Sequence, residues 1–206
     1  MPGKHVRFST QNTFHSPSTP PTSTYANLPG PTPYAPHRSY TDSAAAKGRA
    51  HNLIAFSDSP LLNYDISLHP SMISTHHHGV SSASMLEPAV YPPQTTITIS
   101  TPHLPWSISV SASNGRYVTV SDVLAALYRS LRVNVTSAEF NALGSQKLMR
   151  RATAAYTNRY TRFKGHGGYA EEKQQGVKRV DFLMGCTQFR GVSPTSSADV
   201  WRLHVS

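Results

Sequence analysis

The sequence predicts an α+β domain with a mostly antiparallel sheet of about five or six strands, behind a disordered tail. About three helices are expected between a hairpin and the carboxy-terminal strands. Three observations support this class. Apolar and polar residues alternate in TTITIS and WSISVSA, as in a strand. From residue 120 to residue 163 the apolar residues recur at helical spacing, and alternation returns in GVKRVDFLMG and VWRLHV.

The first 50 residues are expected to form the tail. Half of the 16 prolines lie within the first 36 residues, among Ser, Thr and Gly. Such a stretch cannot bury enough apolar surface to offset the entropy lost on ordering. The domain is therefore expected to span residues 51–206. Its polar segment 71–87, rich in Ser and His, is expected to be a flexible loop.

Strands are expected first along the domain. LLNYDISLH alternates like a short strand between Pro60 and Pro70, and TTITIS forms the next strand. WSISVSASNGRYVTV is expected to be two strands joined at Asn114 and Gly115. This pair supplies the positive φ angles that a tight hairpin turn needs.

Helices follow the hairpin. Thr119 and Asp122 form a predicted capping box for DVLAALYRSLR, and Thr136 and Glu139 form another for VTSAEF. SQKLMRRATAAYTNRYTRF is a longer helical run that Gly165–Gly168 ends. The side chains expected on its buried face are Leu148, Ala152, Ala155, Tyr156 and Tyr160.

Composition indicates a soluble chain of the cytoplasm or nucleus. The single cysteine, Cys186, excludes an internal disulfide and a multi-cysteine zinc site. The amino end MPGKHVRF lacks the apolar core of a signal peptide, and no apolar run approaches membrane-spanning length. Pro2 stands where myristoylation needs glycine.

The stretch KHVRFS places two apolar residues in a tail that offers them nothing to pack against. Lys4, Val6, Arg7 and Phe8 resemble the docking motif by which regulatory proteins hold the catalytic subunit of type 1 protein phosphatase. An extended peptide of this kind adds to a sheet edge, and its alternate side chains enter two apolar pockets. The resemblance implies a phosphatase partner.

The same pattern occurs a second time, in KRVDF at residues 178–182. This copy lies in a predicted strand, where Val180 and Phe182 are expected to face the core. Only the tail copy is therefore expected to dock a partner.

Three tail residues are candidate phosphorylation sites. Ser16 and Thr19 each precede a proline, as proline-directed kinases require, although the stretch is equally well explained as a Pro-rich spacer. Ser9 follows the docking residues directly. A phosphate there would add about −1.5 to −2 charges beside them and is expected to oppose docking.

The net charge of +9 is concentrated in the carboxy-terminal half. Basic residues of the 147–164 helix alternate with aromatic ones, an arrangement that suits phosphate contact and base stacking. The basic residues are Lys147, Arg150, Arg151, Arg159, Arg162 and Lys164, and the aromatic ones are Tyr156, Tyr160 and Phe163. The alternative is that the tyrosines, four apart, belong to the core and that the cations are merely solvated.

No catalytic, cofactor or metal motif stands out. His76, His77 and His78 lie in a Ser-rich loop without the fixed spacing of zinc ligands. GHGG at residues 165–168 lacks the Gly-Lys-Ser/Thr of a phosphate-binding loop. No cofactor and no catalytic residue are therefore predicted.

Several long blocks resemble a family of fungal proteins known only as a domain of unknown function. They include YDISLHPS, ITISTPHLPWSISV, VTVSDVLAALYRSLR, GVKRVDFLMGCTQFRG and ADVWRLHVS, and they run from about residue 52 to the carboxy end. The resemblance implies no reaction or cofactor.

The function expected from the sequence is that of a non-enzymatic interaction or regulatory protein with a phosphatase-docking tail. The first alternative is a nucleic-acid-binding domain that uses the 147–164 helix. The second is an enzyme with an unrecognised site.

Overall fold

The computed structural model describes residues 48–75 and 81–206, and its main sheet has the strand order β6-β5-β8-β7. These strands are β5 (Thr96–Ser100), β6 (Ile108–Ser111), β7 (Phe189–Pro194) and β8 (Val200–Val205). The outer pairs β5–β6 and β7–β8 are antiparallel, whereas the central pair β5–β8 is parallel. The predicted α+β class is confirmed.

Two short ribbons precede and flank this sheet. Strand β1 (Arg49–Ala50) pairs with β4 (Val90–Tyr91), and β2 (Leu62–Asn63) pairs with β3 (Ser74–Thr75). The 3₁₀ turn η1 (Pro70–Met72) and the one-turn helix α1 (Ser82–Met85) complete this region. Segment 71–87, expected as a loop, therefore contains β3 and α1 among its described residues. The expected tail lies outside the described residues apart from residues 48–50.

The remaining helices fall between β6 and β7. They are α2 (Val120–Leu131), α3 (Ser137–Asn141), α4 (Gln146–Thr161) and α5 (Gly168–Gln175), followed by the 3₁₀ helix η2 (Arg179–Leu183). Both predicted capping boxes are present, at the start of α2 and of α3. Helix α5 was not predicted, because Gly165–Gly168 was expected only to end the preceding helix.

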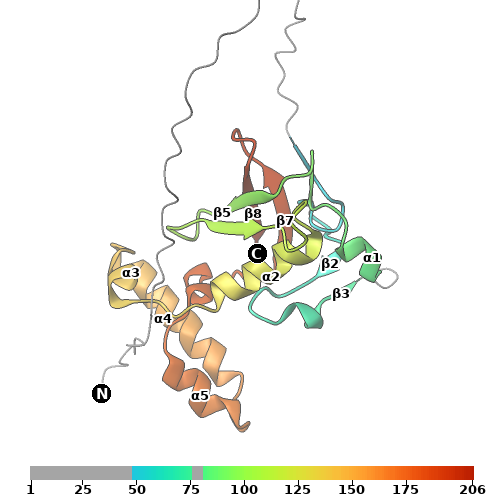
Figure 1. Ribbon diagram of the computed structural model, residues 1–206. Coiled ribbons are helices and arrows are strands. Elements are labelled where there is room, and N and C mark those ends of the chain that lie inside the picture. Colours follow the sequence, from blue (N-terminus) through green and yellow to red (C-terminus); the bar gives the residue numbers. More distant parts are fainter. Residues whose placement is uncertain (1–47, 76–80) are drawn as a thin grey trace, which may run out of the picture.

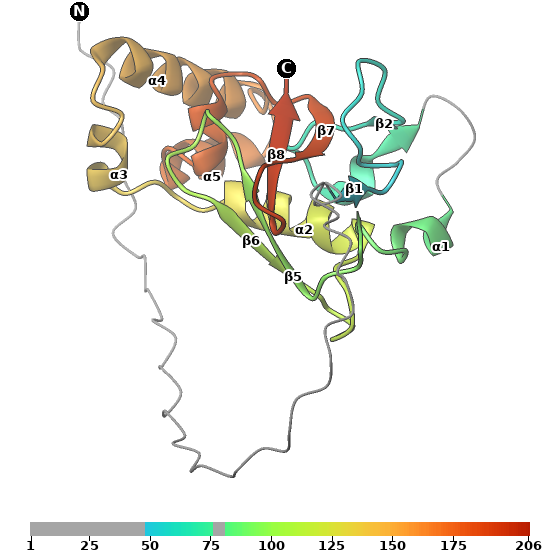
Figure 2. The same ribbon diagram turned by 90° about the horizontal axis from the view of Figure 1, so that it is seen from above.

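Among the described residues, an apolar cluster joins the sheet to α2. The inward residues of β5 and β6 alternate with exposed or half-buried Ser and Thr, and α2 turns its apolar face to them. Leu124, Leu127, Ile97, Ile99 and Trp201 are all buried here. Helices α3, α4 and α5 gather at one end of the molecule, and β1–β3 with α1 lie toward the other (Figure 1, Figure 2).

The hairpin expected at Asn114 and Gly115 is wrong. The observed hairpin is β5–β6, and the chain after Gly115 leads into α2 instead of forming a strand. Asn114 Oδ1 accepts hydrogen bonds from the amides of Arg116 and Tyr117, and the Val118 amide donates to Gln94 O. These amides are therefore not free to pair with β6.

The strand expected in GVKRVDFLMG is also wrong, because residues 179–183 form η2. Val180, Asp181, Phe182 and Leu183 are all buried, whereas a half-buried strand would turn alternate residues outward. Met184, at φ 55°, ends the turn in the left-handed conformation. The expectation that Val180 and Phe182 belong to the core is nevertheless confirmed, since they are 3% and 0% exposed.

Candidate functional site

Helix α4 separates a buried face from an exposed, cationic one. Its buried residues are Ala152, Tyr156 and Arg159, and it packs mainly on η2. Lys147 and Arg150 are exposed on the outer side of the helix, and Arg151, Asn158 and Arg162 are exposed along one flank of the buried face. The predicted helix is confirmed, and most of its predicted cations are accessible.

Arg159 is the exception among the predicted cations, since it is only 7% exposed. Its Nε and Nη2 each donate to one carboxylate oxygen of Asp181 at 2.9 Å, which is the bidentate geometry that favours arginine. Nη2 also donates to Gly176 O at 2.9 Å, and Nη1 donates to Glu172. Arg159 therefore fastens α4 to α5 and η2 and is not free for a ligand.

Glu172 is shared by three cations. Besides Arg159, it accepts hydrogen bonds from Lys178 Nζ at 3.0 Å and from Arg132 Nη2 at 2.7 Å. Burial opposes ionisation of Glu172, but its hydrogen bonds from Lys178 and Arg132 outweigh this, so the pKa lies below its usual value. Burial lowers the pKa of Lys178, and the hydrogen bond to Glu172 only partly offsets that effect.

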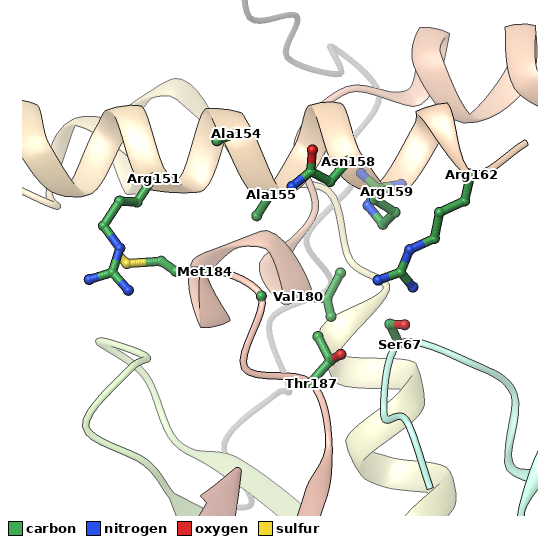
Figure 3. Close-up of a pocket in the computed structure, with 11 residues that line it drawn as sticks. Ser67, Arg151, Ala154, Ala155, Asn158, Arg159, Arg162, Val180, Met184 and Thr187 are labelled. Carbon is green, nitrogen blue, oxygen red and sulfur yellow. The ribbon is translucent and has the colours of Figure 1, made fainter. Parts of the chain in front are cut away.

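A pocket of about 200 Å³ opens where α4 faces η2 and the turn after it. Figure 3 shows Arg151 and Arg162 at its two ends, with Asn158 between them on the same helix. Ser67 and Thr187 supply hydroxyl groups from the side opposite α4. We call this space the arginine groove.

The two terminal arginines of the groove are differently paired. Arg162 Nη1 lies 3.6 Å from Asp65 Oδ2, and its side chain is 57% exposed, so solvent screens the pair. Across residues 48–75 and 81–206, Arg151 forms no ion pair with a carboxylate. Both guanidinium groups therefore remain able to bind an anionic ligand.

The middle of the groove carries no free charge. Ala155, Val180 and Met184 line it between the polar groups, and Arg159, which lies between Asn158 and Arg162 in Figure 3, is already paired with Asp181 and Glu172. The site thus offers one cation at each end and an apolar surface with neutral hydrogen-bonding groups in between. Among the described residues that line the groove there is no histidine or carboxylate that could act as a base for Ser67 or Thr187.

Two of the three predicted aromatic residues, Tyr156 and Tyr160, are not placed for base stacking. Tyr156 is 6% exposed and donates its hydroxyl to Lys173 O at 2.6 Å. Tyr160 is half-buried and packs edge-on against Tyr169, with ring centroids 5.6 Å apart. Phe163 is 37% exposed. Both Phe163 and Lys164 lie beyond the end of α4.

The predicted tail residues lie outside the described part of the chain. They are Lys4, Val6, Arg7, Phe8, Ser9, Ser16 and Thr19, and the histidine run 76–78 is outside it as well. Within the part that is described, no group of three or more His, Cys, Asp or Glu side chains could hold a metal ion. None of the described helices is both long and apolar enough to span a bilayer.

Ser67, Asn158 and Thr187 were missed by the sequence analysis. Asn158 could have been found, because it lies seven residues after Arg151 and four before Arg162, on one helix face. Ser67 and Thr187 carried no such signal, since 120 positions of the chain separate them and only the fold brings them to α4.

The comparisons with known proteins define a family without a known activity. Residues 62–199, about two thirds of the chain, match the group described as "Family of unknown function (DUF6699)". The chain belongs to this family, in agreement with the resemblance of its sequence blocks. No curated protein and no solved structure matches it.

Proposed function

We propose that the chain is a non-enzymatic interaction protein whose domain binds an acidic segment of a partner protein in the arginine groove. The observation that carries the proposal is the placement of Arg151 and Arg162 at opposite ends of a groove with a neutral, partly apolar centre. The excess of basic residues in this half of the chain would attract such a partner over a longer range.

The spacing of the two arginines specifies the segment. Arg162 lies eleven positions after Arg151, which corresponds to about 16 Å along the axis of α4. An extended peptide advances about 3.3 Å per residue, so two carboxylates about five residues apart would meet both guanidinium groups. Small or apolar side chains between them would cover Val180 and Met184.

A nucleic-acid strand fits this groove less well. Each strand of a duplex carries one phosphate per about 3.4 Å, so several phosphates would lie over the uncharged centre. Tyr156 and Tyr160 are packed within the domain and do not offer free faces for stacking. Lys147, Arg150 and Lys164 still extend the cationic surface, so nucleic-acid binding is the competing outcome of the test.

The test uses the full-length protein and fluorescence anisotropy. The probes are a labelled peptide with two glutamates five positions apart among Ser and Ala, its glutamine version, and mixed-sequence single-stranded DNA. We expect binding of the glutamate peptide alone, weakening with salt. Arg151→Glu with Arg162→Glu should weaken it at least tenfold, because attraction at both ends becomes repulsion.

The matched control is Arg116→Glu with Arg129→Glu, which changes the net charge equally at exposed sites outside the groove. This control should keep most of the affinity. Equal losses in the two double variants would mean that net charge, and not the groove, attracts the peptide. Tighter binding of DNA than of peptide would replace the proposal with the nucleic-acid function.

We also propose that KHVRFS docks the catalytic subunit of type 1 protein phosphatase, which would place the protein in the cytoplasm or nucleus. The support is the sequence pattern of Lys4, Val6 and Phe8. The competing copy of the pattern is not free to dock, since Val180 and Phe182 are buried in η2.

A peptide of residues 1–20 should therefore bind the phosphatase subunit without the domain. Val6→Ala with Phe8→Ala should abolish binding, because each anchor loses an apolar contact of about 1.5–3 kcal/mol when fully buried. Ser9→Asp should weaken binding partially by adding a negative charge. Equal binding of the wild-type and double-alanine peptides in calorimetry would show that the two apolar residues are not anchors.

A further inference from the structure

A second hollow lies on the other side of α4, between this helix and α3. It has a volume of about 420 Å³ and is open to solvent on one side. Figure 1 shows α3 beside the amino-terminal part of α4. The residues that line this α3–α4 hollow are Phe140, Gln146, Met149, Arg150, Thr153, Ala154 and Thr157.

The α3–α4 hollow is more apolar than its residue names suggest. The Thr153 hydroxyl donates to Met149 O at 2.9 Å, and the Thr157 hydroxyl donates to Thr153 O at 3.0 Å. Both hydroxyls are thus already bonded within α4. Phe140, Met149 and the methyl groups of the threonines remain as surface for an apolar ligand.

The two hollows meet at Ala154, which lines both of them. Ala154 belongs to a row at four-residue spacing that also contains Arg150, Asn158 and Arg162 and forms a ridge along α4. At Ala154 the ridge is only one methyl group high. An extended chain can therefore pass from the arginine groove to the α3–α4 hollow at this position.

We infer that the partner segment crosses α4 at Ala154 and inserts one large apolar side chain into the α3–α4 hollow. The inference rests on the proposed function and adds an apolar contact, which would distinguish the partner from other acidic segments. The helix with its side chains is about 10 Å across, so the crossing takes about three extended residues. The anchor should thus follow the acidic residue held by Arg151 by about three positions.

Charge complementarity selects this occupant over an uncharged apolar ligand. Arg150 lines the α3–α4 hollow and Arg151 lines the groove, so the route between them has an exposed cation on each side. A purely apolar segment would leave both without a partner. An acidic segment with one apolar anchor satisfies the arginines and fills the hollow.

The experiment compares two peptides on the full-length protein by fluorescence anisotropy. One is the two-glutamate peptide with serine three positions after the second glutamate, and the other has leucine there. We expect the leucine peptide to bind about tenfold more tightly, because burial of a leucine side chain is favourable. Thr157→Trp, which fills the hollow, should remove this gain.

Met149→Gln is a second variant with nearly the same volume, and it should also remove the gain by making the hollow polar. Thermal melts of both variants would test whether they fold as the wild type does. Equal affinity of the serine and leucine peptides would overturn the inference and leave the proposed function standing. A leucine gain that survives both variants would also overturn it, since the contact would lie elsewhere. Failure of both peptides to bind would refute the proposed function and the inference with it.

Discussion

At the scale of single residues, the buried ion cluster explains how α4 is held. Arg132, Arg159 and Lys178 meet Glu172 and Asp181, so three positive charges face two negative ones. Removing ions from water is costly, and the cluster is tolerable because its groups are hydrogen-bonded to one another. It sets the position of α4, and hence the width of the arginine groove.

Glu172→Gln should therefore destabilise the domain by about 3 kcal/mol at neutral pH, because three cations lose a shared anion. Urea unfolding followed by circular dichroism measures this change. Glu171→Gln on the exposed side of α5 is the matched control and should change stability by less than about 0.5 kcal/mol. A similar small effect of both substitutions would show that the cluster contributes little.

Glu172 of this cluster and the capping-box carboxylates of Glu139 and Asp122 contribute to the response to acid. The pKa values of Glu172, Glu139 and Asp122 are lowered, since hydrogen bonds to each ionised carboxyl outweigh the effect of its burial. A lowered pKa stabilises the fold above the unfolded-state value, about 4.3 for glutamate, and this contribution is lost as pH falls through the folded-state value. Glu172→Gln should accordingly flatten the decline of stability below about pH 4.3.

At the scale of elements, the helix starts follow local sequence closely. The side-chain hydroxyls of Thr119 and Thr136 accept hydrogen bonds from the backbone amides of Asp122 and Glu139. In return, the carboxylates of Asp122 and Glu139 accept hydrogen bonds from the backbone amides of the two threonines. All partners lie within four consecutive residues, so no tertiary contact is needed to form them. These two helices therefore begin where the sequence predicts.

Strand β7 depends instead on a close approach of two chain segments. A Cβ atom at Gly191 would lie 2.5 Å from Ala55 O, and its φ of +113° is a conformation that other residues rarely adopt. Gly191→Ala should thus destabilise the domain by more than 2 kcal/mol, since strain of about 1–3 kcal/mol is added to the clash.

Gly115→Ala provides the control for this strand. Gly115 also has a positive φ, +69°, but nothing lies within 4 Å of its added Cβ. Its substitution should cost only about 1–2 kcal/mol, the strain of the left-handed conformation. Equal changes in melting temperature for the two variants would show that the contact with Ala55 is unimportant.

At the scale of the whole molecule, the helical end and the ribbon end are joined by the central sheet and α2 (Figure 2). The composition of residues 1–50 predicts that a protease removes them first. Segment 71–87 should be cleaved next and more slowly, because β3 and α1 hold parts of it. Mass spectrometry of timed digests would identify both cuts, and an intact chain after long digestion would contradict the prediction.

The sequence by itself determined the features that depend on near neighbours. These include the fold class, strands β5 and β8, the two capping boxes and the cationic face of α4. Each rests on periodicity or on side chains a few positions apart, which the chain carries wherever it folds.

Tertiary structure alone decided how these parts form a site. Residues 179–183 form η2 and not the expected strand, because Asp181 turns inward and binds Arg159, 22 residues earlier in the chain. The same ion pair explains why Arg159 is buried and not exposed like the other predicted cations. The arginine groove likewise needs Ser67 and Thr187 opposite Asn158. Such contacts join segments far apart in the chain, and local periodicity carries no information about which distant groups will meet.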